Sequence, residues 1–495
     1  MSKLYSVSEV RTAERRSIAS GVAEYTLMQR AGFQAADIIN QHYPEAVRFV
    51  VLCGGGNNGG DALVAAGRLF ERYQREVVIY SVKELADFTG CAAFAACDLP
   101  RKISFRCCKS LIETDFFPGD VIIDGLLGIG FAGGALRPEV KSFITAANAS
   151  GCPVAALDLP SGLNGDTGEI SSDGAVNADL TVTFGMLKAG LFAGEGSRLR
   201  GKIRLVDIGI EADADPRCEV FSNTDAFKSA VLPDFACHKN SRGRVLIWGG
   251  SEKYPGAPVL CARGALHSGA GIVRLISTGD CSSLAPAELI VKKIQNGSDL
   301  KSEVVPFFPQ SDILVAGCGW GDDIPVEALD IVQEFPGTVI LDADALNMLS
   351  RNIAQWQFRD QVIITPHPGE AARLAAALDL SEYTGDRKQL ALKLASVLKC
   401  VVLLKGRDSV VAGPDGNSCL ISSGNYACAA AGSGDVLAGI LAAVAAGKKD
   451  LFAAAAFGAY LHGAAGETFS GIPTAGDLPE QAGDILTAMR QKRWF

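Results

Sequence analysis

The fold of the amino-terminal half follows from the stretch Val47–Asp61, which reads VRFVVLCGGGNNGGD. Residues 47–53 form an apolar run without regular alternation, as expected of a strand whose two faces are both buried. A cluster of glycines comes next, and a helical pattern then covers residues 62–73. A strand, a glycine-rich turn and a helix in this order predict an α/β fold with a parallel sheet.

The same pattern recurs along the chain on both sides of a polar, Asp-rich passage at 211–224. Before the passage, strand-like runs lie at 76–81, 121–124, 154–158, 180–184 and 203–208, with a further helix at 139–149. After it, strand-like runs lie at 245–248, 272–277, 313–316, 339–342, 361–365 and 401–405, with a helix at 258–268 and a long Ala-rich helix at 435–465. We therefore expect two α/β domains with their boundary in this passage, which suits a chain of 495 residues.

The net charge indicates which partners the protein can have, and the cysteines indicate the cellular compartment in which it works. The net charge of −9 gives no support to a nucleic-acid partner or an anionic membrane surface. No stretch reaches the roughly 18 consecutive apolar residues of a membrane span, and the amino terminus lacks an export signal. The 14 cysteines show no CxxC spacing and lie mostly in apolar runs. These features predict reduced thiols in a cytoplasmic protein.

Oxygen-bearing residues gather at three predicted strand ends in the first half. The turn at 54–61 can hold a phosphate at a helix start, but Asn57 and Asn58 add side-chain carbonyls that a phosphate cradle does not need. Because the carboxyl ends of parallel strands share one edge, this turn can meet Asp124 and Ser161. Asn58, Asp124 and Ser161 carry one negative charge and suit a monovalent cation better than zinc, which leaves Asp158 for acid–base work. Alternatively, Asn-Gly and Asp-Gly pairs are simply turn residues.

In the second half, the segment Gly432–Asp435 is the most informative. Its small residues allow consecutive N–H groups to point into one space at a helix start, as an anion hole for a transferring phosphoryl group does. Asp435 could accept the proton of an attacking hydroxyl. Alternatively, Asp435 is only favoured by the helix dipole, His367 is a turn residue and Lys405 is a solvated lysine.

Both halves resemble known families. Residues 1 to about 215, through segments 56–61, 124–134, 158–162 and 184–188, resemble the NAD(P)H-hydrate epimerase domain. Residues from about 226 onward, through 238–239, 249–251, 365–370, 405–406 and 432–435, resemble the ADP- or ATP-dependent NAD(P)H-hydrate dehydratase. The resemblance implies a Rossmann-like three-layer amino-terminal domain, a ribokinase-like α/β carboxyl-terminal domain and the fused order of a bifunctional nicotinamide-nucleotide repair enzyme.

The resemblance also implies site residues. In the first domain it implies that the hydrated dinucleotide is bound by Asn57, Asn58, Gly59, Gly60, Asp61, Gly128, Ile129, Gly130, Phe131, Ala132, Gly133, Gly134 and Asp158, and that potassium is bound by Asn58, Asp124 and Ser161. In the second domain it implies that the hydrate is bound by Ala257, Gly319, His367 and Asp435, and that the adenine nucleotide is bound by Lys405, Gly406, Arg407, Asp408, Ser409 and Gly434.

We therefore expect the first domain to interconvert the R and S hydrates with Asp158 as its acid–base group. The second domain is expected to phosphorylate the S hydrate with Asp435 as the base and then to release phosphate. The expected cofactors are potassium, ADP or ATP and Mg²⁺, the expected substrates are the hydrates of NADH and NADPH, and a homo-oligomer is expected. A small-molecule kinase fused to a nucleotide-binding domain and a non-catalytic dinucleotide sensor are the rival interpretations. The residues leave open the choice between ADP and ATP and between the two hydrates, as well as transfer between the sites.

Overall fold

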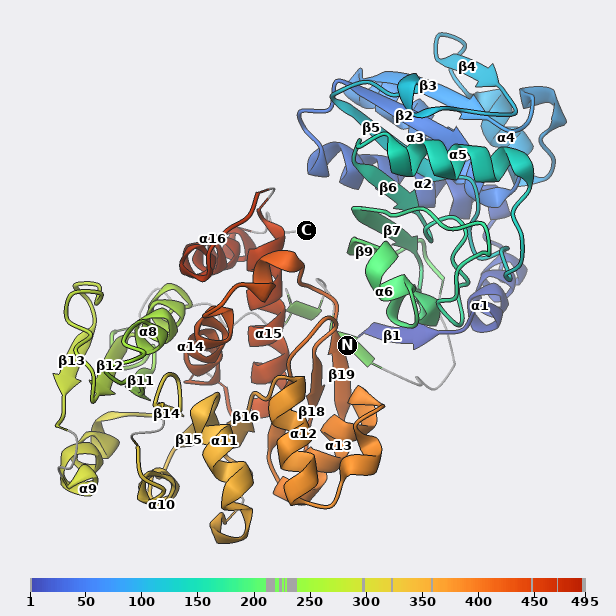
Figure 1. The fold of residues 1–495 in the computed structure, drawn as a ribbon. Coiled ribbons are helices and arrows are strands. Elements are labelled where there is room, and N and C mark those ends of the chain that lie inside the picture. Colours follow the sequence, from blue (N-terminus) through green and yellow to red (C-terminus); the bar gives the residue numbers. More distant parts are fainter. Residues whose placement is uncertain are drawn as a thin grey trace. The chain divides into compact units, whose positions relative to one another are not determined.

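The chain forms two compact units, each built on its own main sheet (Figure 1). The computed structural model describes residues 2–210, 219–221, 225–226, 228, 238–295, 299–321, 324–357, 359–446, 448–469 and 471–491. The units are Ser2–Arg217 and Cys218–Phe495, the second also counting Met1. Most of the expected boundary passage at 211–224 lies outside the described residues.

The main sheet of the amino-terminal unit is parallel throughout and has the strand order β4-β3-β2-β5-β6-β7-β9. A separate short parallel pair joins β1 to β8. The strands are β1 (Ser2–Tyr5), β2 (Arg48–Cys53), β3 (Glu76–Ser81), β4 (Ser104–Cys107), β5 (Asp120–Gly125), β6 (Val154–Leu157), β7 (Leu180–Phe184), β8 (Leu187–Lys188) and β9 (Lys202–Val206). The helices are α1 (Val7–Ala19), α2 (Glu24–His42), α3 (Asn57–Tyr73), α4 (Cys91–Asp98), α5 (Pro138–Ala149) and α6 (Gly196–Leu199).

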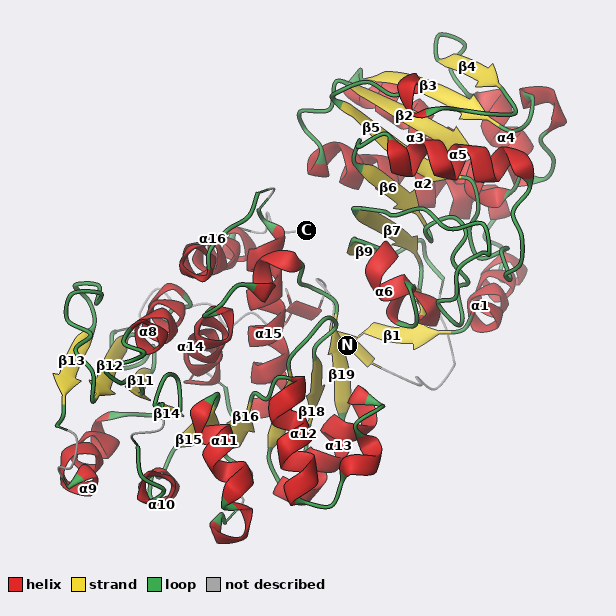
Figure 2. Cartoon of the chain, viewed as in Figure 1, coloured by secondary structure: helices red, strands yellow, loops and turns green. Residues whose placement is uncertain are grey.

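Strand β2 shows why the apolar run does not alternate. Phe49, Val51 and Cys53 belong to the core that packs under α2, α3 and α4, whereas Val50 and Leu52 belong to the core under α5. Successive side chains of a strand point to opposite faces, so both faces of β2 are buried under helices. Figure 2 shows the resulting layers of helix, sheet and helix.

The carboxyl-terminal unit has a longer sheet in the order β13-β12-β11-β14-β15-β16-β17-β18-β19-β10. Its strands are β10 (Glu219–Phe221), β11 (Arg244–Trp248), β12 (Ile272–Ser277), β13 (Ile290–Lys293), β14 (Ile313–Ala316), β15 (Thr338–Leu341), β16 (Val362–Ile364), β17 (Val401–Leu404), β18 (Val410–Ala412) and β19 (Ser418–Ile421). Its helices are α8 (Gly256–His267), α9 (Leu300–Val304), α10 (Glu327–Gln333), α11 (Asp344–Arg351), α12 (Pro368–Ala377), α13 (Arg387–Leu398), α14 (Ser433–Ala446), α15 (Leu451–Glu467) and α16 (Leu478–Arg490).

This sheet is also covered on both faces. Along β11, Val245 and Ile247 pack into the core formed with α8, α14, α15 and α16, whereas Leu246 and Trp248 pack into the core on the other face. Both units are therefore three-layer α/β structures, and the predicted fold class is confirmed.

Two features of the carboxyl-terminal unit differ from the sequence expectation. The sheet is not wholly parallel, since β17, β18 and β19 form antiparallel pairs. The single long Ala-rich helix expected at 435–465 is wrong, because the chain forms α14 and α15 instead. The polar residues Lys448, Lys449 and Asp450 separate them, and the Asp450 carboxylate accepts a hydrogen bond from the Ala453 N–H as the N-cap of α15.

The carboxyl ends of the parallel strands present the turns from which the sites are built. In the amino-terminal unit these turns follow β2, β5 and β6, and in the carboxyl-terminal unit they follow β14, β15, β16 and β17. Among the described residues, no helix combines the length and apolar character needed to cross a bilayer.

Candidate active sites

A cavity of about 720 Å³ opens at the carboxyl ends of β2, β5 and β6. Glycine is required where the turns after β2 and β5 touch, because a Cβ at Gly54 would lie 1.9 Å from the Leu126 carbonyl oxygen. The predicted binding residues that line the cavity are Asn57, Asn58, Asp61, Gly128, Ile129, Gly130, Phe131 and Asp158. Turns that are far apart in the sequence therefore meet around one space.

Asn58, Asp124 and Ser161 form one buried polar cluster around Leu127. The Ser161 hydroxyl donates to Asp124 Oδ1 at 2.6 Å, and the Ser161 N–H donates to Asp124 Oδ2 at 2.8 Å. Asn58 Nδ2 donates to the Leu127 and Leu157 carbonyls at 2.8 and 3.2 Å, while the Leu127 N–H donates to Ser161 Oγ. Asn58 Oδ1 is buried and accepts no hydrogen bond among the described residues. A buried carbonyl without a donor is a ready ligand for a cation.

Burial also governs the charge of this cluster. It raises the pKa of Asp124 to about 6, although the hydrogen bonds from Ser161 and Leu126 oppose the rise. A nearby cation would favour the ionised carboxylate, so the cluster has both an open oxygen and a charge that such an ion would stabilise.

Asp158 follows β6 with φ +65°, a left-handed conformation that Asp tolerates better than most residues. Lys188, only 1% exposed, donates from Nζ to Asp158 Oδ1 at 2.5 Å. The same ammonium donates to Thr183 Oγ1 at 3.2 Å and to the Phe184 carbonyl at 2.8 Å. Asp158 is therefore held by a buried ion pair at the wall of the cavity.

Two more carboxyl groups, Glu14 and Asp61, line the cavity with Asp158. Burial, followed by the charge of Asp158, raises the pKa of both groups. Sequence reasoning did not assign a role to Lys188 or Glu14. Glu14 comes from α1, and no turn motif marks it. Lys188 lies in β8, at the end of the segment 184–188 that carries the family resemblance, but this segment was not given a chemical role.

Five predicted binding residues do not line this cavity. A Cβ at Gly59 would lie 1.9 Å from the Gly54 carbonyl oxygen, and one at Gly60 would lie 2.6 Å from Met28 Cε, so both glycines allow close packing of α3. The stretch 132–134 forms an exposed loop, in which the Ala132 and Gly134 carbonyls accept hydrogen bonds from the Asn164 and Ser171 side chains.

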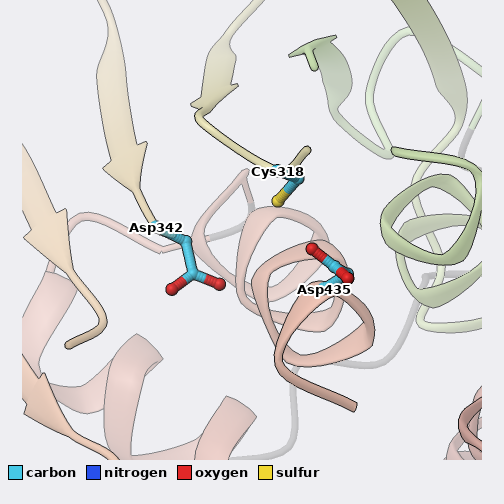
Figure 3. Close-up of side chains that lie close together, drawn as sticks. All are labelled: Cys318, Asp342 and Asp435. Atoms are coloured by element: carbon cyan, nitrogen blue, oxygen red, sulfur yellow. The ribbon is translucent and has the colours of Figure 1, made fainter. Parts of the chain in front are cut away.

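In the carboxyl-terminal unit, Cys318, Asp342 and Asp435 converge from the ends of β14 and β15 and the start of α14 (Figure 3). One ligand-type atom from each lies within 4.8 Å of the others. Burial, and then the charge of Asp342, raises the pKa of Asp435 to about 7. A carboxyl group with such a pKa can take up and release a proton near neutral pH.

Lys405 joins this group from the end of β17. Its Nζ lies 2.5 Å from Asp342 Oδ1 and 4.0 Å from Glu370 Oε2. Burial opposes the charge of Lys405, but Asp342 and Glu370 outweigh it and raise its pKa. A Cβ added at Gly434 would lie 3.4 Å from Lys405 Nζ, which shows that Lys405 reaches the start of α14. Asp342 and Glu370 are site residues that the sequence prediction did not include.

His367 and Glu370 form the start of α12. The Glu370 carboxylate accepts from the His367 N–H at 2.8 Å, and His367 Nδ1 accepts from the Gly369 N–H at 3.0 Å. Burial raises the pKa of Glu370 to about 7, whereas burial and the charge of Lys405 lower the pKa of His367. The side chain of His367 is half exposed, and its Nε2 lies 3.4 Å from Glu370 Oε1.

The start of α14 is shaped by small residues. Gly432 has φ +87°, and Ser433 Oγ lies 2.9 Å from Nε2 of the buried His462. Burial lowers the pKa of His462 to about 4, so its ring is neutral at pH 7. Gly319, with φ +70°, lies against Ala257: a Cβ at Gly319 would be 2.9 Å from the Ala257 Cβ.

The predicted nucleotide loop follows Lys405. Gly406 has φ +149° and Asp408 φ +50°. Ser409 Oγ donates to the Gly406 carbonyl at 3.0 Å, and Arg387 donates to the Arg407 carbonyl. The loop is thus a tight turn braced by its own serine.

Comparison with known proteins agrees with the two-unit division of the site residues. The family model described as NAD(P)H-hydrate dehydratase matches residues 245–488, and the one described as YjeF-related protein N-terminus matches residues 24–190. The bifunctional NAD(P)H-hydrate repair enzyme of Coxiella burnetii is 34% identical over 94% of this chain and 95% of its own length. That of Escherichia coli is 34% identical over 93% and 88%.

Solved structures resemble part of the chain. An ADP/ATP-dependent NAD(P)H-hydrate dehydratase from Bacillus subtilis, co-crystallised with ATP and Mg²⁺, is 27% identical with a TM-score of 0.46, covering 56% of this chain and 99% of that one. A ribokinase-like protein from Enterococcus faecalis is 20% identical with a TM-score of 0.48, covering 56% and 99%.

Proposed function

The chain belongs to the family of bifunctional NAD(P)H-hydrate repair enzymes, and we propose how its residues divide the work. Its activities are epimerisation of the R and S forms of NAD(P)H hydrate and nucleotide-dependent dehydration of the S form. The amino-terminal unit is Rossmann-like and the carboxyl-terminal unit ribokinase-like. We assign an epimerase domain to residues 1–215 and a dehydratase domain to residues 226–495.

In the epimerase domain, Asp158 is the acid–base group. Inversion at C6 of the hydrated nicotinamide requires a bond at that carbon to break and re-form. When a base removes the proton of the C6 hydroxyl, the C6–N1 bond can break to give an aldehyde, with the electron pair moving to N1. The nitrogen then adds back to the other face of the carbonyl, and the proton returns to the oxygen. The observation that supports Asp158 is its position on the wall of the 720 Å³ cavity with one carboxylate oxygen held by Lys188. Asn57, Asn58, Asp61 and residues 128–131 line the cavity beside it and bind the dinucleotide, while Gly59 and Gly60 allow the close packing of α3.

Potassium fits the cluster of Asn58, Asp124 and Ser161. The supporting observation is the buried Asn58 Oδ1, which lacks a donor, next to a carboxylate and a hydroxyl. These are hard oxygen ligands with one negative charge, which suits a monovalent cation. When bound, the ion would stabilise negative charge that develops on the substrate. Asn58 Nδ2 holds the turn after β5 in place through Leu127.

In the dehydratase domain, Asp435 removes the proton from the hydroxyl group of the S hydrate. The hydroxyl oxygen then attacks the terminal phosphorus of the nucleotide, the shorter nucleotide leaves, and the N–H groups at 432–435 stabilise the phosphoryl oxygens. The ring nitrogen's lone pair next expels phosphate from C6, and loss of a proton from C5 restores the reduced nicotinamide. The pKa of Asp435 near 7 supports this role.

An adenine nucleotide is the co-substrate, and we propose that residues 405–409 and Gly434 bind it. Lys405 supplies the positive charge for its phosphates, since Nζ lies beside the start of α14, where a Cβ at Gly434 would be 3.4 Å away. Its ion pairs with Asp342 and Glu370 keep the ammonium charged and in place. The carboxylates of Asp342 and Glu370 are oxygen donors of the kind that Mg²⁺ prefers, so the donor set fits this ion. When bound, it would neutralise charge on the phosphates. Ala257, Gly319 and His367 contact the hydrate.

One experiment tests both activities. A mixture of R and S hydrates is incubated with ADP or ATP, and the absorbance of the reduced nicotinamide is followed. The wild type restores the whole pool and releases free phosphate. Asp158→Asn should restore only the S fraction, and Asp435→Asn should restore none while still epimerising. A stable phosphorylated product would support a kinase instead, and binding without turnover would support a sensor.

Cellular location and assembly are further proposals. The cysteines of the described part of the chain are free thiols, which supports a cytoplasmic location. We also propose a homo-oligomer, testable by light scattering. NADH and NADPH hydrates are both substrates in this proposal.

A further inference from the structure

We propose that Lys188 is the positioning residue of the epimerase site and selects which oxygen of Asp158 transfers the proton. This inference rests on the proposed role of Asp158 as the acid–base group. It assigns Oδ1 to the buried ion pair and Oδ2 to the substrate.

The hydrogen bonds separate the two oxygens of the carboxylate. Oδ1 accepts from Lys188 Nζ at 2.5 Å and lies 3.4 Å from the Phe184 N–H and 3.5 Å from Thr183 Oγ1. Oδ2 receives no hydrogen bond within the part of the chain that the structure describes. It faces Gly128, where an added Cβ would lie 3.4 Å away, and Gly128 lines the cavity. Oδ2 is therefore the oxygen on the substrate side.

Lys188 is itself fixed in orientation. An ammonium group has three N–H donors, and Lys188 directs them at Asp158, Thr183 Oγ1 and the Phe184 carbonyl. Its backbone is held because β8 pairs with β1, with Lys188 opposite Tyr5. Since Lys188 is 1% exposed, it does not reach the substrate, and its effect must pass through Asp158.

The restraint that Lys188 places on Asp158 matters for proton transfer. Asp158 follows the end of β6 in a left-handed turn, and the shortest hydrogen bond to its carboxylate is the one from Lys188. Proton transfer requires the oxygen within hydrogen-bond reach of the substrate, and a displacement of about 1 Å can cost roughly 100-fold in rate. Lys188 is the group that limits this displacement.

The test is a double-mutant cycle on the full-length protein with Lys188→Met and Asp158→Asn. We expect Lys188→Met to lower kcat for epimerisation by roughly 100-fold with KM changed by less than about threefold. In the Asp158→Asn background, the same substitution should lower kcat no further. Lys141→Met, which removes an exposed lysine from an ion pair with Asp173, is the matched control and should leave kcat unchanged.

Loss of folding is separated from loss of positioning by two readouts. Dissociation constants for the dinucleotide are measured for each variant, and thermal unfolding is followed by circular dichroism. If binding persists while kcat falls only when Asp158 is present, the inference stands. Additive losses in the two backgrounds, or a wild-type kcat in Lys188→Met, overturn it. An active Asp158→Asn instead overturns the proposed role of Asp158, so the two failures are distinct.

Discussion

Replacing Asp435 by Asn should stabilise the carboxyl-terminal unit while abolishing dehydration, and the gain should depend on pH. Burial and Asp342 raise the pKa of Asp435 from 3.8 to about 7 in the folded protein. Between these values the native state binds more protons than the unfolded state, so stability falls as pH rises through this window. The cost is fully present above pH 7 and absent below about pH 4.

The magnitude follows from the shift. About three pKa units at 1.36 kcal/mol each give a penalty of at most about 4 kcal/mol at pH 8. At pH 5 the pH is only about 1.2 units above the unfolded-state pKa of Asp435, so the penalty is at most about 1.6 kcal/mol. Asparagine cannot ionise, and Asp435→Asn should therefore gain up to about 2.5 kcal/mol more at pH 8 than at pH 5.

Tryptophan fluorescence reports the unfolding of the carboxyl-terminal unit alone, because all four tryptophans of the chain, at 248, 320, 356 and 494, belong to that unit. Guanidinium unfolding of wild type and Asp435→Asn at pH 5 and pH 8 gives the four free energies of unfolding. A stability difference that is the same at both pH values would refute the assigned ionisation of Asp435.

Four further predictions follow from the same geometry. The dehydration rate of the wild type should fall as pH drops below about 7, because the base becomes protonated, and a flat profile between pH 5.5 and 8 would contradict the assigned base. Asn58→Ala should raise the potassium concentration that gives half-maximal epimerisation by about tenfold, because losing a ligand that contributes about 1.4 kcal/mol weakens binding tenfold. A titration with KCl measures this concentration, and the dehydration rate of the same variant is the internal control. Gly434→Ala places a methyl group next to Lys405 Nζ, in the space proposed for the nucleotide, so the KM for ADP should rise. The free energy of unfolding, measured by tryptophan fluorescence, should stay equal or rise by up to about 1 kcal/mol, because alanine favours a helix more than glycine does. Asp120→Ala leaves the mostly buried side chain of Arg48 without its ion-pair partner, which lies opposite it on β5. The free energy of opening β2 and β5, measured by hydrogen exchange, should fall by about 3 kcal/mol. Lys141→Ala removes an exposed ion pair and should change this free energy very little.

The part of the fold that the sequence predicted is the part encoded locally. Strands buried on both faces, such as β2 and β11, appear as uninterrupted apolar runs followed by glycine. One rule predicted that Asn58, Asp124 and Ser161 would meet, because all three lie at or just beyond the carboxyl ends of parallel strands, which share one edge of the sheet.

The remainder depends on contacts between distant segments. Lys188 donates to Asp158, 30 residues earlier in the chain, and lies in β8, which pairs with the distant β1; no local pattern encodes either contact. Asp342 and Glu370 could not be assigned to the site from the sequence, because this assignment requires knowing where the end of β15 and the start of α12 lie relative to Lys405. The long helix expected at 435–465 failed for a different reason: alanine favours helix throughout, and the stop depends on the short polar stretch that caps α15.

That polar stretch between α14 and α15 also divides an apolar sequence into two segments, each shorter than a bilayer-spanning helix. The two helices have 14 and 17 residues, and both are rich in alanine and leucine. Joined without interruption they would exceed the length of a bilayer-spanning segment, about 20 residues. Lys448, Lys449 and Asp450 fall at the midpoint, where each charge would cost about 2.5–3.5 kcal/mol during insertion by the translocon. The three charged residues thus place the largest insertion penalty at the centre of the joined apolar segment, which opposes its insertion into a bilayer as one helix.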